Sequence, residues 1–321
     1  MVSAPTAVGE PLRRVVAAIV VAVLSGALMA VQARINGELG LRMGSGAAAA
    51  AVSFGSGLVL VSAVVLLVPA ARRGVPALLQ AARTRTLPWW SFLGGLGGAL
   101  LVVSQGVASA VLGVALFSAA VIAGQMLSGL VVDRLGISPG GRRAVTARRA
   151  AAAIVAVAVL AVPVFGGTAS VPVLALLLPV LAGAAVAWQQ AVNGRAAAAA
   201  GSSLTATLLN FVVGFTVLVP AAAVFALVQQ RLPAVPAEPW VYSGGAVGAL
   251  FIFGFVVAVR VLGVLLMGLA SIGGQLLTGL LLDVVGRVEG VDVPRTALAA
   301  GVVLACALLA ALPSRRGLTT D

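Results

Sequence analysis

Histidine and lysine are absent from this sequence of 321 residues, and cysteine occurs once, as Cys306. A single cysteine excludes an intramolecular disulfide, and without histidine no thiolate or imidazole metal site is visible. The sequence also lacks the phosphate-binding pattern GxxxxGK[ST] and the acid-rich pair that a metal-dependent membrane transferase needs. We therefore expect no catalytic residue, no metal and no cofactor, and interpret the protein as a non-enzyme.

Charge is also scarce, at 9% of residues, whereas 61% are hydrophobic and the mean hydropathy is +1.18. Apolar runs of roughly 20 residues, long enough to cross a bilayer, recur along the chain, which predicts a polytopic membrane protein. The net charge of +12 comes from arginines in small clusters between these runs. That pattern is typical of loop charges that set membrane orientation, so we expect the lipid bilayer as a partner and no nucleic acid.

Glycine, proline and arginine divide the sequence into ten expected transmembrane helices. They cover residues 15–33, 47–69, 89–107, 110–132, 149–166, 172–190, 204–226, 240–258, 261–282 and 296–312. We assign five to a first unit, 1–166, and five to a second, 167–321. With the N-terminus in the cytoplasm, fifteen arginines fall in inside segments and five in outside segments. This bias predicts that both termini are cytoplasmic.

Two motifs occur twice. GQMLSGLVVDRLG at residues 124–136 returns as GQLLTGLLLDVVG at 274–286, with seven of thirteen positions identical, and QARING at 32–37 returns as QQAVNG at 189–194. Their shared order and similar offsets, 150 and 157 residues, indicate a tandem duplication. Because each unit has an odd number of expected spans, the two units must cross the membrane in opposite directions, as inverted repeats.

The longer motif places a glutamine, a glycine and an aspartate at i, i+4 and i+8, on one face of a helix. These residues are Gln125, Gly129 and Asp133 in the first copy and Gln275, Gly279 and Asp283 in the second, with Ser128 and Thr278 beside them. Two interpretations of the amides and hydroxyls stay open. They bind substrate in a central cavity, or they join helices, with about 0.6 kcal/mol for each amide hydrogen bond.

Asp133 and Asp283 end their apolar runs, where the helix dipole disfavours a carboxylate, so each needs a partner or a purpose. Nearby arginines supply candidate partners: Arg134 or the Arg148–Arg149 pair for Asp133, and Arg287 or Arg295 for Asp283. The two aspartates are either structural anchors or paired gate or coupling residues at opposite membrane faces. No acidic residue lies in the middle of an expected span, so no proton-coupling carboxylate is evident.

The shorter motif pairs Gln32 with Asn36, and Gln189 with Asn193, on one helix face by their i, i+4 spacing. Either these side chains satisfy backbone groups at a helix end, or they line two vestibules of one route through the membrane.

Three patterns together resemble the YdcZ-like branch of the drug/metabolite transporter superfamily. They are Q-x-x-x-N-G ending the first span, Ser53-Phe54-x-x-Gly57 in the second and G-Q-x-L-[ST]-G-L-x-x-D-x-x-G in the fourth, each repeated in the second unit, with Asn210-Phe211-x-x-Gly214 as the second copy of the middle pattern. The resemblance covers nearly the whole chain, and five-span members of the branch resemble one half of it. It implies an all-α integral membrane protein of drug/metabolite transporter-like (EamA-like) fold, an exporter in the bacterial cytoplasmic (inner) membrane.

We therefore expect a secondary transporter, an exporter or facilitator of a small-molecule metabolite, that works by alternating access between the two repeats. Two alternatives stay open: a non-transporting membrane assembly or sensor protein, and a flippase for a lipid-linked substrate. A homodimer is an open alternative for the assembly.

Overall fold

The computed structural model describes residues 12–139, 141–162, 173–286 and 291–312, and these residues form helices and no strand. Nine helical stretches within them are long and apolar enough to cross a bilayer. Apolar runs fold this way because a helix satisfies its own backbone hydrogen bonds, which lipid cannot do. The protein is thus a multi-span helical membrane protein.

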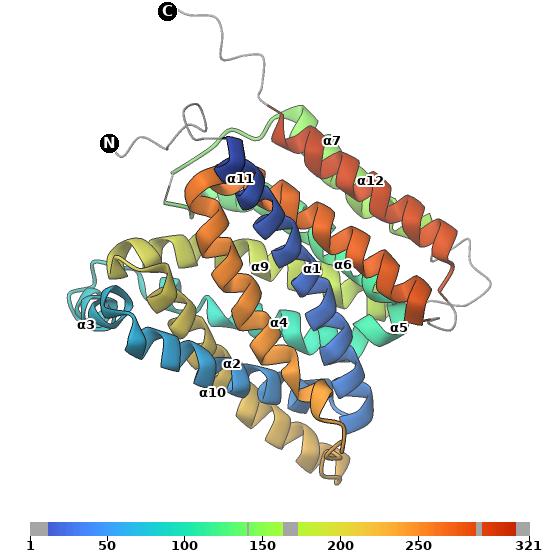
Figure 1. Ribbon diagram of the computed structural model, residues 1–321, viewed down its shortest axis with the longest axis horizontal. Helices are drawn as coiled ribbons and strands as arrows, with labels where there is room; N and C mark the ends of the chain where they lie inside the picture. Colours follow the sequence, from blue (N-terminus) through green and yellow to red (C-terminus); the bar gives the residue numbers. More distant parts are fainter. Residues whose placement is uncertain (1–11, 140, 163–172, 287–290, 313–321) are drawn as a thin grey trace, which may run out of the picture.

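Figure 1 labels the helices in chain order, those of the first half before those of the second. The first half contains α1 (Leu12–Met43), α2 (Gly46–Leu67), α3 (Pro69–Arg83), η1 (Trp89–Phe92), α4 (Gly95–Ser104), η2 (Gln105–Ser109), α5 (Ala110–Leu112), α6 (Val114–Leu135) and α7 (Ala147–Ala158). The second contains α9 (Val173–Ala200), α10 (Ser203–Gln229), η3 (Pro239–Ser243), α11 (Gly244–Gly286) and α12 (Val293–Ala311).

Nine of the ten expected spans correspond to these membrane-length stretches. The expected span at 149–166 corresponds to α7, which has 12 residues and ends at Ala158, and residues 163–166 lie outside the described part of the chain. A helix of 12 residues is shorter than a bilayer core. A tenth span therefore stays a prediction.

The turns between helices recur in both halves because the same residue types stand at equivalent positions. Gly44 and Gly201 have φ values of 66° and 64°, and the serine after each caps the next helix. Gly113 (φ 78°, ψ 160°) separates α5 from α6, and Gly263 (φ 70°, ψ 172°) interrupts α11 at the equivalent place. Only glycine adopts such a conformation without strain.

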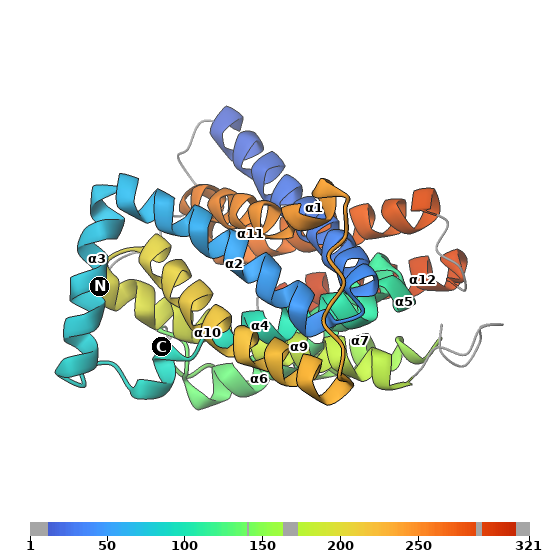
Figure 2. The ribbon, with the colours of Figure 1, turned by 90° about the horizontal axis from the view of Figure 1, so that it is seen from below.

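The two halves pack through reciprocal contacts. Helix α1 packs along α11, and its equivalent α9 packs along α6, while α2 lies beside its own equivalent α10 (Figure 2). At each close crossing a glycine faces a carbonyl oxygen so tightly that a Cβ atom would overlap it. The pairs are Gly26 with Ser271, Gly183 with Val121, Gly274 with Val23, and Gly124 with Val180. Small residues thus allow these helices to approach closely.

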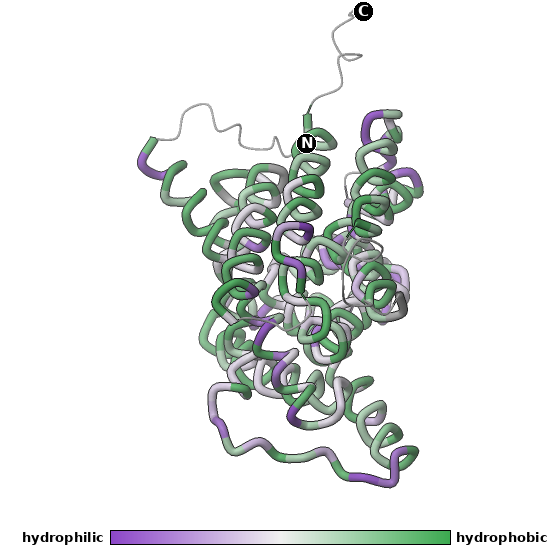
Figure 3. The backbone as a smooth tube through the Cα atoms, turned by 90° about the vertical axis from the view of Figure 1, so that its right-hand side faces the viewer, coloured by the Kyte–Doolittle hydropathy of each residue, from purple (hydrophilic) through white to green (hydrophobic). Residues whose placement is uncertain are grey.

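Hydropathy along the chain follows this arrangement. Figure 3 shows a tube that is hydrophobic along most of the helices, with hydrophilic residues at helix ends, in connecting segments and at a few interior points. We call the end of the bundle that holds Met43 and Asp283 the Gly113 end. The opposite end, which holds Leu135 and Ala200, is the Gly263 end.

Candidate functional site

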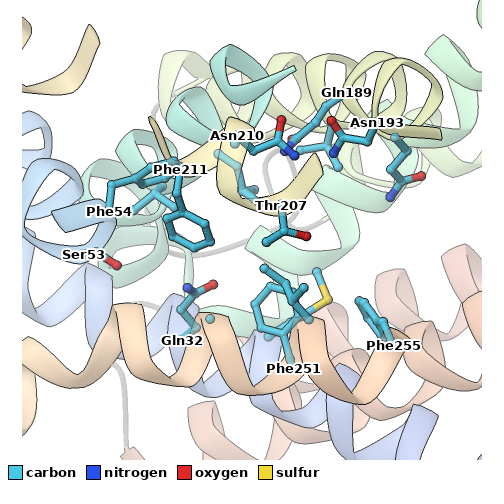
Figure 4. A pocket seen from close by; sticks show the side chains of 18 residues that line it. Gln32, Ser53, Phe54, Gln189, Asn193, Thr207, Asn210, Phe211, Phe251 and Phe255 are labelled. Atoms are coloured by element: carbon cyan, nitrogen blue, oxygen red, sulfur yellow. The ribbon is translucent and has the colours of Figure 1, made fainter. Parts of the chain in front are cut away.

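A central cavity of about 240 Å³ lies between six helices, α1, α2, α4, α9, α10 and α11. Figure 4 shows amide side chains and phenylalanine rings around it, and none of its 18 lining residues is charged. The polar lining residues are Gln32, Ser53, Gln189, Gln190, Asn193, Thr207 and Asn210. The cavity is therefore aromatic, amide-rich and electrically neutral.

Equivalent residues of the two halves line this cavity together. Gln32 and Gln189 are equivalent, as are Ser53 and Asn210, which start the Ser-Phe and Asn-Phe patterns. The rings of Phe54 and Phe211 lie 5.2 Å apart, centroid to centroid, at 49°. Each ring also packs against a glycine of the other half, Phe54 on Gly214 and Phe211 on Gly57. The cavity is thus built at the interface between the halves.

Two amide oxygens converge where α4 begins. A Cβ atom on Gly94 would lie 2.5 Å from Asn193 Oδ1 and 2.8 Å from Asn210 Oδ1. Asn210 is 8% exposed, and its Oδ1 accepts no hydrogen bond from the described residues. A buried acceptor without a donor is costly, so this oxygen is a point at which a ligand donor would be favoured.

Side-chain hydrogen bonds close the cavity toward the Gly113 end. Gln32 Nε2 donates to the Gly244 carbonyl at 3.0 Å, and Asn36 Nδ2 donates to Gln105 Oε1 at 2.7 Å. Gln105 stands in η2, a π-helical turn whose Ser109 hydroxyl donates to the Ala33 carbonyl at 2.7 Å. Asn36 is therefore buried in a helix contact rather than in the cavity.

Asp283 forms a second closing contact at the Gly113 end. Its Oδ1 and Oδ2 accept hydrogen bonds from the Val114 and Ala115 amides at 2.7 and 2.8 Å, and the residue is 1% exposed. The carboxylate therefore caps the first turn of α6, where backbone N–H groups and the helix dipole favour an anion. A Cβ atom on Gly113 would lie 2.8 Å from Oδ2, so glycine is required there.

The cap differs from the partners expected for Asp283. Arg295 pairs with Asp292 at 2.8 Å, and Arg287 lies outside the described residues, so its pairing stays a prediction. The expectation of Arg295 was wrong because it considered only nearby charges, whereas two backbone amides 168 and 169 residues away hold the carboxylate.

Asp133, the equivalent residue, has a different partner. Its Oδ2 lies 2.6 Å from Arg149 Nη2, which confirms one of the arginines expected from the sequence. A groove between α6, α11 and α12 opens beside this pair, lined in part by Gln125, Gly129 and Gly268. Equivalent positions are thus in close contact at the Gly113 end and separated by a groove at the Gly263 end.

The predicted substrate-binding residues divide into two groups. Gln32, Gln189 and Asn193 lie together in the central cavity. The two motifs were expected to line two separate vestibules or to satisfy helix ends, and these three residues instead share one cavity. Gln125 lies in the groove, and Gln275 is buried with its Nε2 3.3 Å from Ser118 Oγ. Ser128 and Thr278 are half-buried and do not line the cavity, and Asn36 bonds Gln105.

Sequence reasoning gave no site role to Asn210 or to the phenylalanines of the cavity. The signal that could have found Asn210 is its place opposite Ser53 in the repeat, directly before an equivalent phenylalanine. Gln190, which also lines the cavity, stands next to Gln189 but has no glutamine equivalent in the first half.

A family model described as "Putative inner membrane exporter, YdcZ" matches residues 17–162 and 174–311. The chain belongs to this YdcZ family. The match confirms the resemblance carried by the repeated motifs, and it identifies the chain as a multi-pass inner-membrane protein of a transporter family rather than an enzyme family. No curated protein matches the chain.

Proposed function

We propose that this YdcZ-family protein is a secondary transporter that exports or facilitates passage of a small metabolite by alternating access. One observation carries the proposal. Equivalent residues of both halves build one cavity, and among the described residues the contacts that close it at the Gly113 end have no matching contact at the equivalent positions at the Gly263 end. A pathway open on one side at a time requires this asymmetry.

The two halves act as inverted repeats in this proposal. The glycine–carbonyl contacts support it, because α1 packs on the second copy of the long motif and α9 on the first. Such exchanged contacts are expected when a rotation of half a turn carries each half onto the other. With an odd number of spans in each half, that axis lies in the membrane plane, as in many secondary transporters.

The described conformation faces the Gly263 end. Asn36 is hydrogen-bonded in a helix contact outside the cavity, whereas its equivalent Asn193 lines the cavity. Cavity residues of α10, such as Thr207, come from the part of the helix nearest this end. The arginine distribution supports a cytoplasmic position for the Gly263 end. The state is therefore inward-facing.

The two aspartates are the gate residues of this mechanism. Asp283 caps α6 and holds the Gly113 end closed. In the opposite state, Asp133 leaves Arg149 and caps the backbone amides of residues 264 and 265, which follow Gly263 as residues 114 and 115 follow Gly113. Asp283 then leaves α6, and the cavity opens to the outside.

Solute efflux from proteoliposomes tests the transport function. Liposomes carry a panel of labelled neutral, zwitterionic and charged metabolites, and we expect at least one to leave faster than from protein-free liposomes. Gly98→Leu places a side chain beside Gln189 and Phe54 in the cavity and should abolish this flux. Gly301→Leu in α12, where a Cβ atom meets no neighbour within 4 Å, is the matched control and should preserve it. Equal flux through the Gly98→Leu variant would contradict the proposal.

A further inference from the structure

The central cavity combines four phenylalanine rings with amide groups and has no charged lining residue. We propose that its ligand is a neutral, planar, ring-containing solute with a carboxamide-like N–H edge. The inference rests on the proposed function only in treating this cavity as the substrate site. It concerns the chemical class of the solute and is independent of how the solute moves.

Charge is the first selective property. An ion that enters a water-poor cavity loses its hydration, and only a counter-charge or several hydrogen bonds can compensate it. The two aspartates of the proposed gate do not line the cavity. Asp133 is paired with Arg149, and Asp283 accepts hydrogen bonds from the α6 amides. A solute with net charge therefore finds no partner of opposite sign among the 18 lining residues.

Size and shape are the second property. A cavity of about 150 Å³ lined by apolar side chains holds benzene. A cavity of about 240 Å³ therefore has space for one six-membered ring and a small polar substituent. Figure 4 shows Phe211 and Phe251 reaching into this space from different helices, so a flat ring can pack against aromatic surfaces there.

Hydrogen bonding is the third property. Asn210 Oδ1 is buried and accepts no bond from the described residues, and Asn193 Oδ1 faces the same point beside Gly94. An NH₂ group carries two hydrogens and can donate to both oxygens at once. Across the cavity, Gln32 donates one N–H to the Gly244 carbonyl, and its oxygen is a further acceptor. The lining also holds amide and hydroxyl donors, so a carboxamide-like group, with an N–H edge and a carbonyl oxygen, fits it.

Nicotinamide and nicotinate provide a matched pair of probes, because the two share a ring and differ in the charge and the N–H donor of one substituent. We expect purified wild-type protein in nanodiscs to bind nicotinamide saturably, with a Kd of about 1 mM or tighter by isothermal titration calorimetry. Nicotinate should bind at least about tenfold more weakly, because its carboxylate meets only neutral donors and no counter-charge in the cavity. Equal binding of both probes, or no binding of nicotinamide, would overturn the proposal.

Two variants locate the binding. Asn210→Leu keeps the side-chain volume and removes the acceptor, so nicotinamide affinity should fall about tenfold. Thr216→Val in the same helix is the control, because Thr216 lies outside the cavity lining and its hydroxyl donates to the Val212 carbonyl, so its loss should leave affinity within about twofold. Unchanged affinity in Asn210→Leu would place the ligand elsewhere and refute the site. If that variant does not fold, the nicotinamide–nicotinate comparison on wild-type protein still decides the ligand class.

This binding assay separates the two proposals. Nicotinamide binding without flux of any solute would refute the transport function and leave the ligand class standing. Flux of a charged solute together with equal binding of nicotinate would refute the ligand class and leave the transport function standing.

Discussion

The Asp283 carboxylate accepts a hydrogen bond from the Val114 amide at 2.7 Å, across the boundary between the two halves of the chain. The C-terminal part of α11 is thereby fixed to the first turn of α6. The equivalent residue Asp133 instead pairs with Arg149, beside a groove. This difference between two equivalent aspartates is the clearest asymmetry between the two halves.

Asp283→Asn tests the cap directly. A neutral amide loses the charge-assisted bonds to two backbone amides, each worth about 1.5–3 kcal/mol for a charged acceptor. We expect a lower unfolding temperature and faster thiol labelling of a cysteine placed at Ala115, which is buried in the first turn of α6. Asp292→Ala removes the cap of α12, where Asp292 accepts from the Arg295 amide at 3.1 Å, and should cost about 1 kcal/mol without increasing that labelling.

Equal labelling of the cysteine at residue 115 with and without Asp283→Asn would mean that the cap fixes helix packing without controlling access.

Gly113→Ala and Gly263→Ala impose similar backbone strain at equivalent positions. Each forces alanine to a positive φ, at a cost of about 1–3 kcal/mol. Only at Gly113 does the new Cβ atom also meet the Asp283 carboxylate, at 2.8 Å, whereas nothing lies within 4 Å at Gly263. We therefore expect Gly113→Ala to lower the thermal unfolding midpoint more than Gly263→Ala.

If the Gly263→Ala variant were the less stable of the two, the described conformation would not be the one that predominates in the membrane.

Gln275→Ala separates the packing role of the long motif from a substrate role. Gln275 donates to the Ser118 hydroxyl inside the protein, so its loss should cost about 0.6 kcal/mol of stability, and rarely more than about 1.7. Efflux from proteoliposomes should stay at the wild-type rate, because Gln275 does not line the central cavity. A large loss of flux with unchanged stability would restore the substrate role for this residue.

Glu238 makes one contact at the Gly113 end sensitive to pH. The Arg42 guanidinium pairs with Glu238 and lowers the pKa of that carboxyl, and Arg42 also pairs with Glu38 at 2.7 Å. Because the folded-state pKa is lowered, the stabilisation is present above the ordinary glutamate pKa and is lost as pH falls through the lowered value. The effect should be small, because the carboxyl is exposed.

Unfolding temperature measured from neutral pH into the acid range tests this pair. Glu238→Gln should remove part of the acid-dependent loss of stability that the wild type shows. Identical pH profiles for the two proteins would exclude a contribution from the Arg42–Glu238 pair.

Repetition in the sequence was sufficient to predict much of the fold. The two copies of each motif placed equivalent helices, because a duplicated segment folds the same way twice, and the apolar runs located nine spans that the structure contains. The partner of Asp133 could be predicted from the sequence because Arg149 stands only 16 residues away, on the next helix.

Contacts between distant segments could not be predicted in the same way. The Asp283 cap depends on how α11 crosses α6, which no local pattern encodes. The sequence also put equal weight on Gln125 and Gln275 as cavity residues, because a polar stripe on an apolar helix looks the same whether it faces a cavity, a groove or a serine. Helix rotation decides between these, and in this protein it turns Gln32, Gln189 and Asn193 into the cavity instead.

The most direct test measures two distances in the same molecule by pulsed electron spin resonance, after Cys306→Ala removes the native thiol. One pair of spin labels, on the exposed residues Val111 and Val285, reports on the Gly113 end, and a second pair, on exposed Leu135 and Leu266, reports on the Gly263 end. We predict that Asp283→Asn lengthens the first distance and shortens the second. A longer first distance with an unchanged or longer second distance would contradict alternating access in this protein.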